Sequence, residues 1–283
     1  MNLKKNKTPN EAEKVIIKAE GQKKLINWQE LWQYRDLFIF LIWRDIKTRY
    51  AQSILGVGWA VIQPVFSMIV FTIVFGNIAE VNSEGVPYAI FSYTALVPWT
   101  FFSSSLTSSS SSLISSKNLI TKVYFPRLVI PISPVLGKLI DFGISFLILI
   151  GLMIWFGISP GIGVLLIPLF VVLMVFTATG VGMWLTALSI QYRDSRYGSN
   201  FFIQLLMYAS PVIYASSSIP ERYQFLYSLN PMVGVIEGFR AVLLGTRSIP
   251  WNYLATGSVM AVVFLVSGAL YFRSMEKYFA DVA

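Results

Sequence analysis

The sequence predicts an all-α membrane protein with six transmembrane helices and with both termini in the cytoplasm. Of the 283 residues, 55% are hydrophobic and 13% are charged, whereas soluble domains usually carry about 25% charged residues. Residues 55–78 form a charge-free run that can cross a bilayer as one helix, because about 20 apolar residues span the hydrocarbon core. Basic Arg44 and Arg49 precede this run and acidic Glu80 and Glu84 follow it, so the positive-inside rule places its start in the cytoplasm.

The part of the chain before the first span divides in two. Residues 1–26 are polar and rich in Lys and Glu, so we expect a flexible cytoplasmic tail. Residues 27–52 predict an amphipathic helix at the membrane interface, because apolar side chains such as Phe38 and Leu41 recur at helical spacing between charged ones. Such a helix could anchor the chain or receive force from a cytoplasmic partner. Residues 53–283 then hold all six spans.

The first two spans contain polar residues that lipid cannot satisfy. Gln63, which precedes Pro64 in the first span, must face protein or water. The second span, residues 87–116, has a serine-rich second half. These serines could allow close packing against neighbouring helices, each hydroxyl bonding to its own helix, or they could form a wettable wall for a polar cargo. The sequence leaves both interpretations open.

Residues 117–134, between the second and third spans, carry three basic residues and no acidic residue, which indicates a cytoplasmic position. Pro126, Pro131 and Pro134 are expected to prevent a long helix there. A short helix at about residues 118–124 remains compatible with this pattern. It would be part of an ordinary basic loop or a lever that an external motor could push.

Spans 3 and 4 share the charge-free residues 143–192, with a turn at residues 157–163. Lys138 and Asp141 are spaced i, i+3 near the inner end of span 3. This spacing predicts a local ion pair, and we favour that role over a part in transport.

Span 5 is expected at residues 200–216, with Pro211 inside it, and span 6 at residues 251–272. Between them Asn230 and Pro231 form a helix start, because Asn caps unpaired amides and proline suits the first helical turn. The apolar residues that follow line one face. They predict a second amphipathic helix, external, that dips into the outer leaflet.

The sequence excludes several kinds of chemistry. It has no Cys and no His, which removes thiolate sites, the usual general base and the commonest metal ligand. It has no GxxxxGK[ST] loop for ATP phosphates, and its basic residues follow membrane topology instead of forming a nucleic-acid-binding face. We therefore expect a passive path with no metal or cofactor of its own, driven by another subunit. A twofold homodimer would place twelve helices around one path.

Residues 53–64, SILGVGWAVIQP, resemble the start of the first span in polysaccharide-export ABC permeases of the type 2 class. Further segments are similar to that family in the same order: residues 118–127, 192–194, 210–214, 229–232 and 279–282. The resemblance implies that residues 53–283 are the permease domain of an exporter for lipid-linked O-antigen, capsule or teichoic acid chains. It also implies a homodimer in the bacterial inner membrane, with two cytoplasmic ATPase subunits that use ATP and Mg.

The resemblance and the residue chemistry give four sets of candidate site residues. The resemblance implies an ATPase-coupling set, Trp32, Arg35, Arg44, Lys47, Lys117, Asn118, Lys122, Tyr124, Phe125 and Arg127, and a cytoplasmic-entrance set, Arg49, Ser53, Leu55, Gly56, Arg193 and Arg196. A sliding sugar chain needs side chains that bind weakly and repeatedly, which suggests a substrate-path set of Trp59, Gln63, Tyr93, Trp99, Ser104 and Ser108. The outer-gate set is Asn230, Pro231, Glu237 and Arg240. The entrance arginines could meet a lipid diphosphate or ordinary lipid headgroups.

Two other functions stay open from the sequence. An ATPase-independent channel or small-molecule permease would need the same kind of path. A membrane-embedded transferase of polyprenyl-linked sugars would meet similar lipids, although the loops lack the paired acidic residues that such an enzyme would use. An ATPase that copurifies with the chain would favour export.

Overall fold

The computed structural model describes residues 32–51, 56, 58–120, 122, 124–192 and 194–276, and within these ranges the chain is helical and has no strand. The longer helices are α2 (Arg35–Tyr50), α3 (Gly58–Phe71) with its π-helical continuation η1 (Thr72–Ile78), α4 (Tyr88–Ser115), α6 (Val129–Trp155), α7 (Ile167–Gln191), α8 (Ser195–Tyr208), α10 (Pro231–Leu244) and α11 (Trp251–Met275). Shorter ones are α5 (Lys117–Ile120), η2 (Ile162–Leu166), η3 (Ser216–Ser218) and α9 (Glu221–Ser228). The all-α prediction is confirmed, and the predicted tail, residues 1–26, lies outside the described residues.

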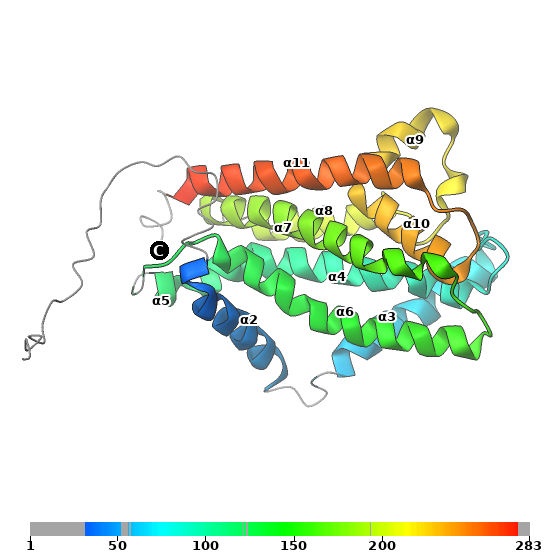
Figure 1. Ribbon diagram of the computed structural model, residues 1–283, viewed down its shortest axis with the longest axis horizontal. Helices are drawn as coiled ribbons and strands as arrows, with labels where there is room; N and C mark the ends of the chain where they lie inside the picture. The colour runs from blue at the N-terminus through cyan, green and yellow to red at the C-terminus, as the bar shows by residue number, and fades with distance from the viewer. Residues whose placement is uncertain are drawn as a thin grey trace, which may run out of the picture.

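Figure 1 shows an elongated helical bundle in which α4 and α7 run through the middle, with α11 on one side and α6 on the other. α2 packs against α6, and α3 packs against α4 and α6. α5 and the last turn of α11 lie at one end, which we call the inner end. α9, α10 and the loop after η1 lie at the opposite end, which we call the outer end.

Only some of the described helices are long and apolar enough to cross a membrane. By length and composition, four helical segments of this part of the chain can cross a membrane: Gly58–Ile78, Val129–Trp155, Ile162–Gln191 and Trp251–Met275. The predicted second span corresponds to α4, which is 28 residues long and carries no charge. The predicted fifth span corresponds to α8, whose 14 residues reach about 21 Å, less than a hydrocarbon core of roughly 30 Å.

The third span begins earlier than expected, because the prolines do not prevent a long helix. α6 starts at Val129 and contains both Pro131 and Pro134. Pro131 stands in the first turn, where an N–H group has no helical partner to lose. The preceding short helix, α5, covers only four residues. The prediction that residues 117–134 exclude a long helix is therefore wrong.

The helix at the predicted fifth span ends earlier than expected. α8 stops at Tyr208, so Pro211 lies beyond the helix and not inside it. A proline disfavours helical backbone in the residue before it and lacks the N–H that a further turn requires. The predicted helix over residues 200–216 is wrong in its second half.

The helix between spans 5 and 6 has the predicted ends but not the predicted amphipathic face. Asn230 caps α10 by accepting a hydrogen bond from the Met232 amide (3.1 Å), and Gly245 ends it in the left-handed conformation with φ of 65°. Every residue of α10 is buried, including Glu237 and Arg240. α10 packs against α4, α7 and α11, so it lies inside the bundle and has no lipid-facing side.

The core joins the middle helices to α10. Phe142 of α6 and Phe170 of α7 both pack their rings against Phe239 of α10. α7 and α11 approach closely at two glycines, where a Cβ on Gly268 would lie 2.2 Å from the carbonyl oxygen of Gly180. Small residues at such crossings allow backbone-to-backbone packing, which drives helix association in membranes.

Candidate functional site: a polar groove along α4

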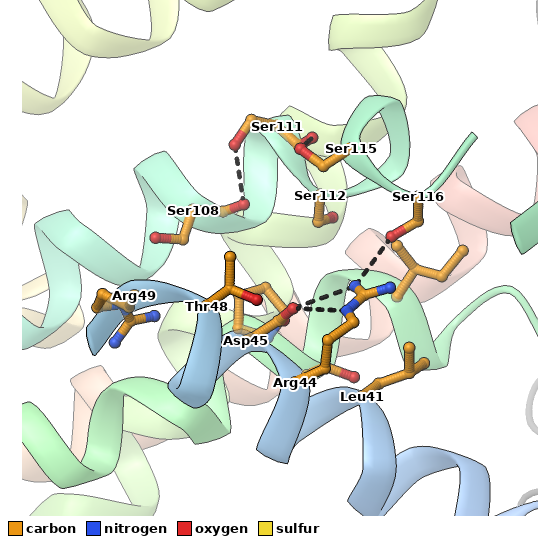
Figure 2. Close-up of a pocket in the computed structure, with 13 residues that line it drawn as sticks. Leu41, Arg44, Asp45, Thr48, Arg49, Ser108, Ser111, Ser112, Ser115 and Ser116 are labelled. Atoms are coloured by element: carbon orange, nitrogen blue, oxygen red, sulfur yellow. Dashed lines mark hydrogen bonds and ion pairs between the residues drawn. The ribbon is translucent and has the colours of Figure 1, made fainter. Parts of the chain in front are cut away.

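A polar cavity opens between α2, α4 and α6 near the inner end. It has a volume of about 490 Å³. Its lining is mostly hydroxyl and charged side chains: Arg44, Asp45, Thr48, Arg49, Ser108, Ser111, Ser112, Ser115, Ser116 and Ser133, with Leu41, Ile130 and Pro134. Figure 2 shows the serines of α4 facing Arg44, Asp45 and Thr48 of α2.

A second, smaller cavity of about 120 Å³ continues toward the middle of the bundle. It shares Arg49 with the first cavity, so the two adjoin there. Its lining includes Tyr50, Gly56, Trp59, Gln63, Thr100, Ser104, Lys138, Asp141 and Ser145. We call the two cavities together the α4 groove, because α4 residues at helical spacing line it throughout. These are Val97, Thr100, Phe101, Ser104, Ser108, Ser111, Ser112 and Ser115, and Ser116 follows directly after the helix.

The serine-rich half of α4 has two faces with different roles. On the groove face, the hydroxyls of Ser104, Ser111 and Ser115 donate to carbonyls of their own helix, at 3.0 to 3.3 Å. On the opposite face, Ser109 is fully buried, donates to the Pro131 carbonyl of α6 (2.9 Å) and lies 3.3 Å from the Thr186 hydroxyl of α7. The buried face therefore packs against neighbouring helices, as the close-packing interpretation expects. The groove face lines a polar cavity, and its role as a wall for a polar cargo stays a prediction.

Arg44 and Asp45 form a neutral pair at the inner mouth of the groove. The Nη2 atom of Arg44 lies 3.1 Å from Oδ1 of Asp45 and donates to the Ser116 hydroxyl over 3.3 Å (Figure 2). The arginine ties α2 to the end of α4, and its charge is compensated within α2.

Asp141 of α6 accepts hydrogen bonds from three side chains where the two cavities adjoin. Arg49 Nη1 donates to Oδ2 over 2.9 Å and Lys138 Nζ over 3.0 Å, while the Tyr50 hydroxyl donates to Oδ1. Burial, followed by the hydrogen bond to Asp141, raises the pKa of Tyr50 to about 12, so its hydroxyl stays protonated at physiological pH. The predicted Lys138–Asp141 pair is confirmed, but it belongs to a larger cluster that joins α2 to α6.

The structure divides the predicted substrate-path residues. Gln63, Trp59 and Ser104 line the smaller cavity, and Ser108 lines the larger one. Tyr93 and Trp99 are buried in the core, where the Tyr93 hydroxyl donates to the Ser145 carbonyl over 3.3 Å. These two aromatic residues do not line the groove, so we no longer assign them to the path.

Two of the predicted entrance residues are placed at the groove. Arg49 lines both cavities, and Gly56 lines the smaller one with φ of 45°, a left-handed conformation that suits glycine. Ser53, Leu55 and Arg193 lie outside the described residues, as does the side chain of Arg196.

The predicted coupling residues gather at the inner end but differ in exposure. Trp32 and Tyr124 are 71% and 77% exposed, and Arg35, Lys47, Lys117, Asn118 and Lys122 are exposed too. Phe125, at 4% exposure, is a core residue that packs with α2 and α11 side chains. Arg127 donates to the Glu276 carbonyl over 2.6 Å, which ties this segment to the end of α11.

The outer-gate residues form a buried structural unit. Besides capping α10, Asn230 donates to the Ala209 carbonyl and to the Ser210 hydroxyl, while Pro231 occupies the first position of the helix. Glu237 and Arg240 pair over 3.1 Å at 4% and 1% exposure. Arg240 also donates to the carbonyls of Val212, Tyr214 and Phe91, so the pair fixes the segment that follows α8.

Several groove residues were not among the predicted site residues: Tyr50, Lys138, Asp141, Ser111, Ser112, Ser115, Ser133 and Ser145. The sequence contained a signal for two of these residues. Ionisable residues within a membrane span usually mark a functional site, and Lys138 and Asp141 are such residues. The meeting of Tyr50 with Asp141, 91 positions away, has no local sequence signal.

A hydroxyl-lined groove along a central helix of an apolar bundle is the kind of polar lining that a membrane permease needs for a path through a bilayer. The chain belongs to the ABC-2 type transporter family, whose family model matches residues 36–244. The resemblance to type 2 ABC permeases is thereby confirmed.

Relatives with assigned names match nearly the whole chain. The O-antigen export system permease protein RfbA of Myxococcus xanthus is 30% identical over 255 residues, which covers 89% of this chain and 97% of the relative. The protein of the same name from Klebsiella pneumoniae is 28% identical, over 87% of this chain and 95% of its own. The polysialic acid transport protein KpsM of Escherichia coli is 25% identical, over 84% and 92% respectively.

Proposed function

We propose that this chain is the permease subunit of an ATP-driven exporter whose cargo is a lipid-linked polysaccharide of the O-antigen, capsule or teichoic acid type. Membership of the ABC-2 type transporter family supports the exporter class. The names of the relatives, O-antigen export and polysialic acid transport, support the class of cargo.

The observation that carries the proposal is the α4 groove. Its lining combines serine hydroxyls, the Gln63 amide and the Trp59 ring, which can bind a sugar chain weakly at many points. Many weak contacts favour sliding, because a tight site would hold the polymer in place.

We place the chain in the bacterial inner membrane with six spans, formed by α3 with η1, α4, α6, α7, α8 and α11, and with both termini in the cytoplasm. The distribution of charge supports this orientation. At the inner end, α5 carries Lys117 and the last turn of α11 carries Arg273, whereas the loop after η1 at the outer end carries acidic Glu80 and Glu84. Cytoplasmic segments carry the excess of Lys and Arg in membrane proteins.

Two copies would enclose the path. Thr107 and Ser115 of α4 are exposed in one copy of the chain, although they lie on a helix of membrane-spanning length. Polar side chains at membrane depth face protein or water and not lipid. A second copy, related by a twofold axis, would cover this face and make the groove part of a shared conduit.

The energy would come from two cytoplasmic ATPase subunits, which would bind ATP and Mg. The chain itself has no phosphate-binding loop. In the segment after α5, Lys122 and Tyr124 are exposed on the surface of the molecule. Trp32, which precedes α2, is exposed too. We assign this surface to the contact with the ATPase.

The test is to purify the chain with its partner ATPase, reconstitute the complex in vesicles and measure nucleotide hydrolysis and cargo export together. We expect export only with ATP, and we expect Lys122→Glu combined with Tyr124→Ala to keep hydrolysis while lowering export at least about fivefold. Arg222→Glu, on exposed α9 at the outer end, is the matched control. Export without nucleotide would favour a channel, and sugar transfer by the purified chain would favour a transferase. Either result would refute the proposal.

A further inference from the structure

The Asp141 cluster contains more positive than negative charge. Arg49 and Lys138 both bond to the one carboxylate of Asp141, and among the described residues no other carboxylate lies within ion-pair distance of either cation. The three side chains are 25%, 13% and 19% exposed. The cluster therefore carries a net charge of about +1 in a largely buried position, which is costly unless another anion compensates it.

The surroundings of the cluster offer room for such an anion. The smaller cavity of the α4 groove is lined by Arg49, Lys138 and Asp141, and its volume of about 120 Å³ exceeds the roughly 10–15 Å³ that one water molecule needs. Arg44 lies nearby on the same helix, but Asp45 already neutralises it. The excess charge is thus confined to the junction of the two cavities.

The donors at this point have the chemistry of a phosphate site. A guanidinium presents parallel N–H groups that match phosphate oxygens, and an ammonium adds a compact charge. Tyr50 supplies a hydroxyl donor in the same cluster. On α3, Ile62 and Phe66 stand three residues after the cavity-lining Trp59 and Gln63, and they are exposed apolar residues, which can accompany a hydrocarbon chain.

We propose that Arg49 and Lys138 bind the diphosphate head of a lipid-linked cargo, and that Asp141 is the internal counterion that holds the two cations until the diphosphate displaces it. The assignment rests on the proposed function, because it takes the cargo to be linked to a lipid. It gives the Lys138–Asp141 pair a role in binding in addition to the tie between α2 and α6.

The test measures binding of radiolabelled farnesyl diphosphate to the purified full chain in phosphatidylcholine nanodiscs. Arg49→Gln and Lys138→Gln should each weaken binding roughly tenfold, the usual loss for one charge-assisted hydrogen bond. Asp141→Asn should strengthen binding severalfold, because it removes the competing anion and leaves an amide oxygen to accept from Tyr50. Arg222→Gln removes the same charge at the outer end and should change nothing.

The cation substitutions and Asp141→Asn are expected to change binding in opposite directions, and this distinguishes a binding site from a purely structural cluster. If the cluster only ties α2 to α6, Asp141→Asn would leave binding unchanged or weaken it, and the proposal would fail. Farnesol binding as tightly as the diphosphate would also overturn it. Displacement of the probe by phosphatidylglycerol at equal concentration would assign the site to bulk lipid headgroups instead. Failure of ATP-driven export with diphosphate binding intact would refute the proposed function and leave this site standing.

Discussion

Two charged clusters at opposite ends of the described bundle look alike in sequence and differ in structure. Each is built on an i, i+3 pair, Lys138–Asp141 in α6 and Glu237–Arg240 in α10. The charges of the outer pair balance, with Arg240 1% and Glu237 4% exposed. Arg240 also donates hydrogen bonds to three backbone carbonyls. The inner cluster holds two cations to one carboxylate. Both clusters border a cavity, of about 470 Å³ at the outer pair and about 120 Å³ at the inner cluster, so charge balance is what distinguishes them.

The difference separates a structural ion pair from a binding site. A buried pair whose charges compensate each other leaves no net charge to attract an ion, and its removal affects folding. A cluster with excess charge beside a cavity has capacity left, and its removal should affect binding more than folding. Charge balance therefore predicts the role better than residue type does.

The largest effect is expected at the outer pair. Arg240→Met would leave the Glu237 carboxylate buried without its cation and the Val212 and Tyr214 carbonyls without their donor. We expect a loss of about 3–5 kcal/mol in the free energy of unfolding, seen as poor expression and a lower thermal unfolding temperature in detergent. Arg222→Met, on the exposed surface of α9, is the matched control. Equal unfolding temperatures for the two variants would contradict a structural role for the Glu237–Arg240 pair.

A second comparison extends the contrast to the two faces of α4. Ser109→Leu places a larger side chain where a Cβ on Gly182 would already lie 2.7 Å from the serine hydroxyl, so we expect a loss of roughly 1–3 kcal/mol from overpacking. Ser108→Leu points into the groove and should change stability by less than about 0.5 kcal/mol while lowering export. Thermal unfolding and export assays on both variants test this. Equal destabilisation by the two changes would show that both faces are packed.

At the inner cluster, a much smaller effect on stability is expected than at the outer pair. Arg49→Gln removes one partly exposed ion pair, and solvent screening limits the expected loss to about 1 kcal/mol or less. Export, in contrast, should fall strongly. The measurement is thermal unfolding beside ATP-driven export in the same preparation. If Arg49→Gln lowers the unfolding temperature as much as Arg240→Met does, then both clusters are structural and the proposed difference between them is wrong.

Local patterns predicted much of the fold. The charge-free first span, the uncharged α4 and the Asn230–Pro231 helix start depend on neighbouring residues only, and the structure has each of them. The errors arose where position within the fold decides the outcome. Pro131 is tolerated because it falls in the first turn of α6, and α10 is buried because distant carbonyls satisfy Arg240.

The groove was predictable only in part for the same reason. Serine content and the amide of Gln63 indicated a polar path, and Gln63, Ser104 and Ser108 do line the groove. Helical spacing does not say which face of α4 meets the core, so Tyr93 and Trp99 were assigned to the path although they are buried. The contact of Arg49 with Asp141 joins residues 92 positions apart, which no local pattern encodes.

The central claim, that the cargo passes along the groove face of α4, can be tested by cysteine labelling, since the natural chain contains no Cys. Ser104→Cys, Ser108→Cys and Ser111→Cys would be compared with Ser105→Cys and Ser109→Cys, which are fully buried in the native chain. A charged thiol reagent should modify the first three, and a lipid-linked polysaccharide stalled in the ATPase complex should protect them. Labelling that does not distinguish the two faces, or that the stalled cargo leaves unchanged, would contradict the account.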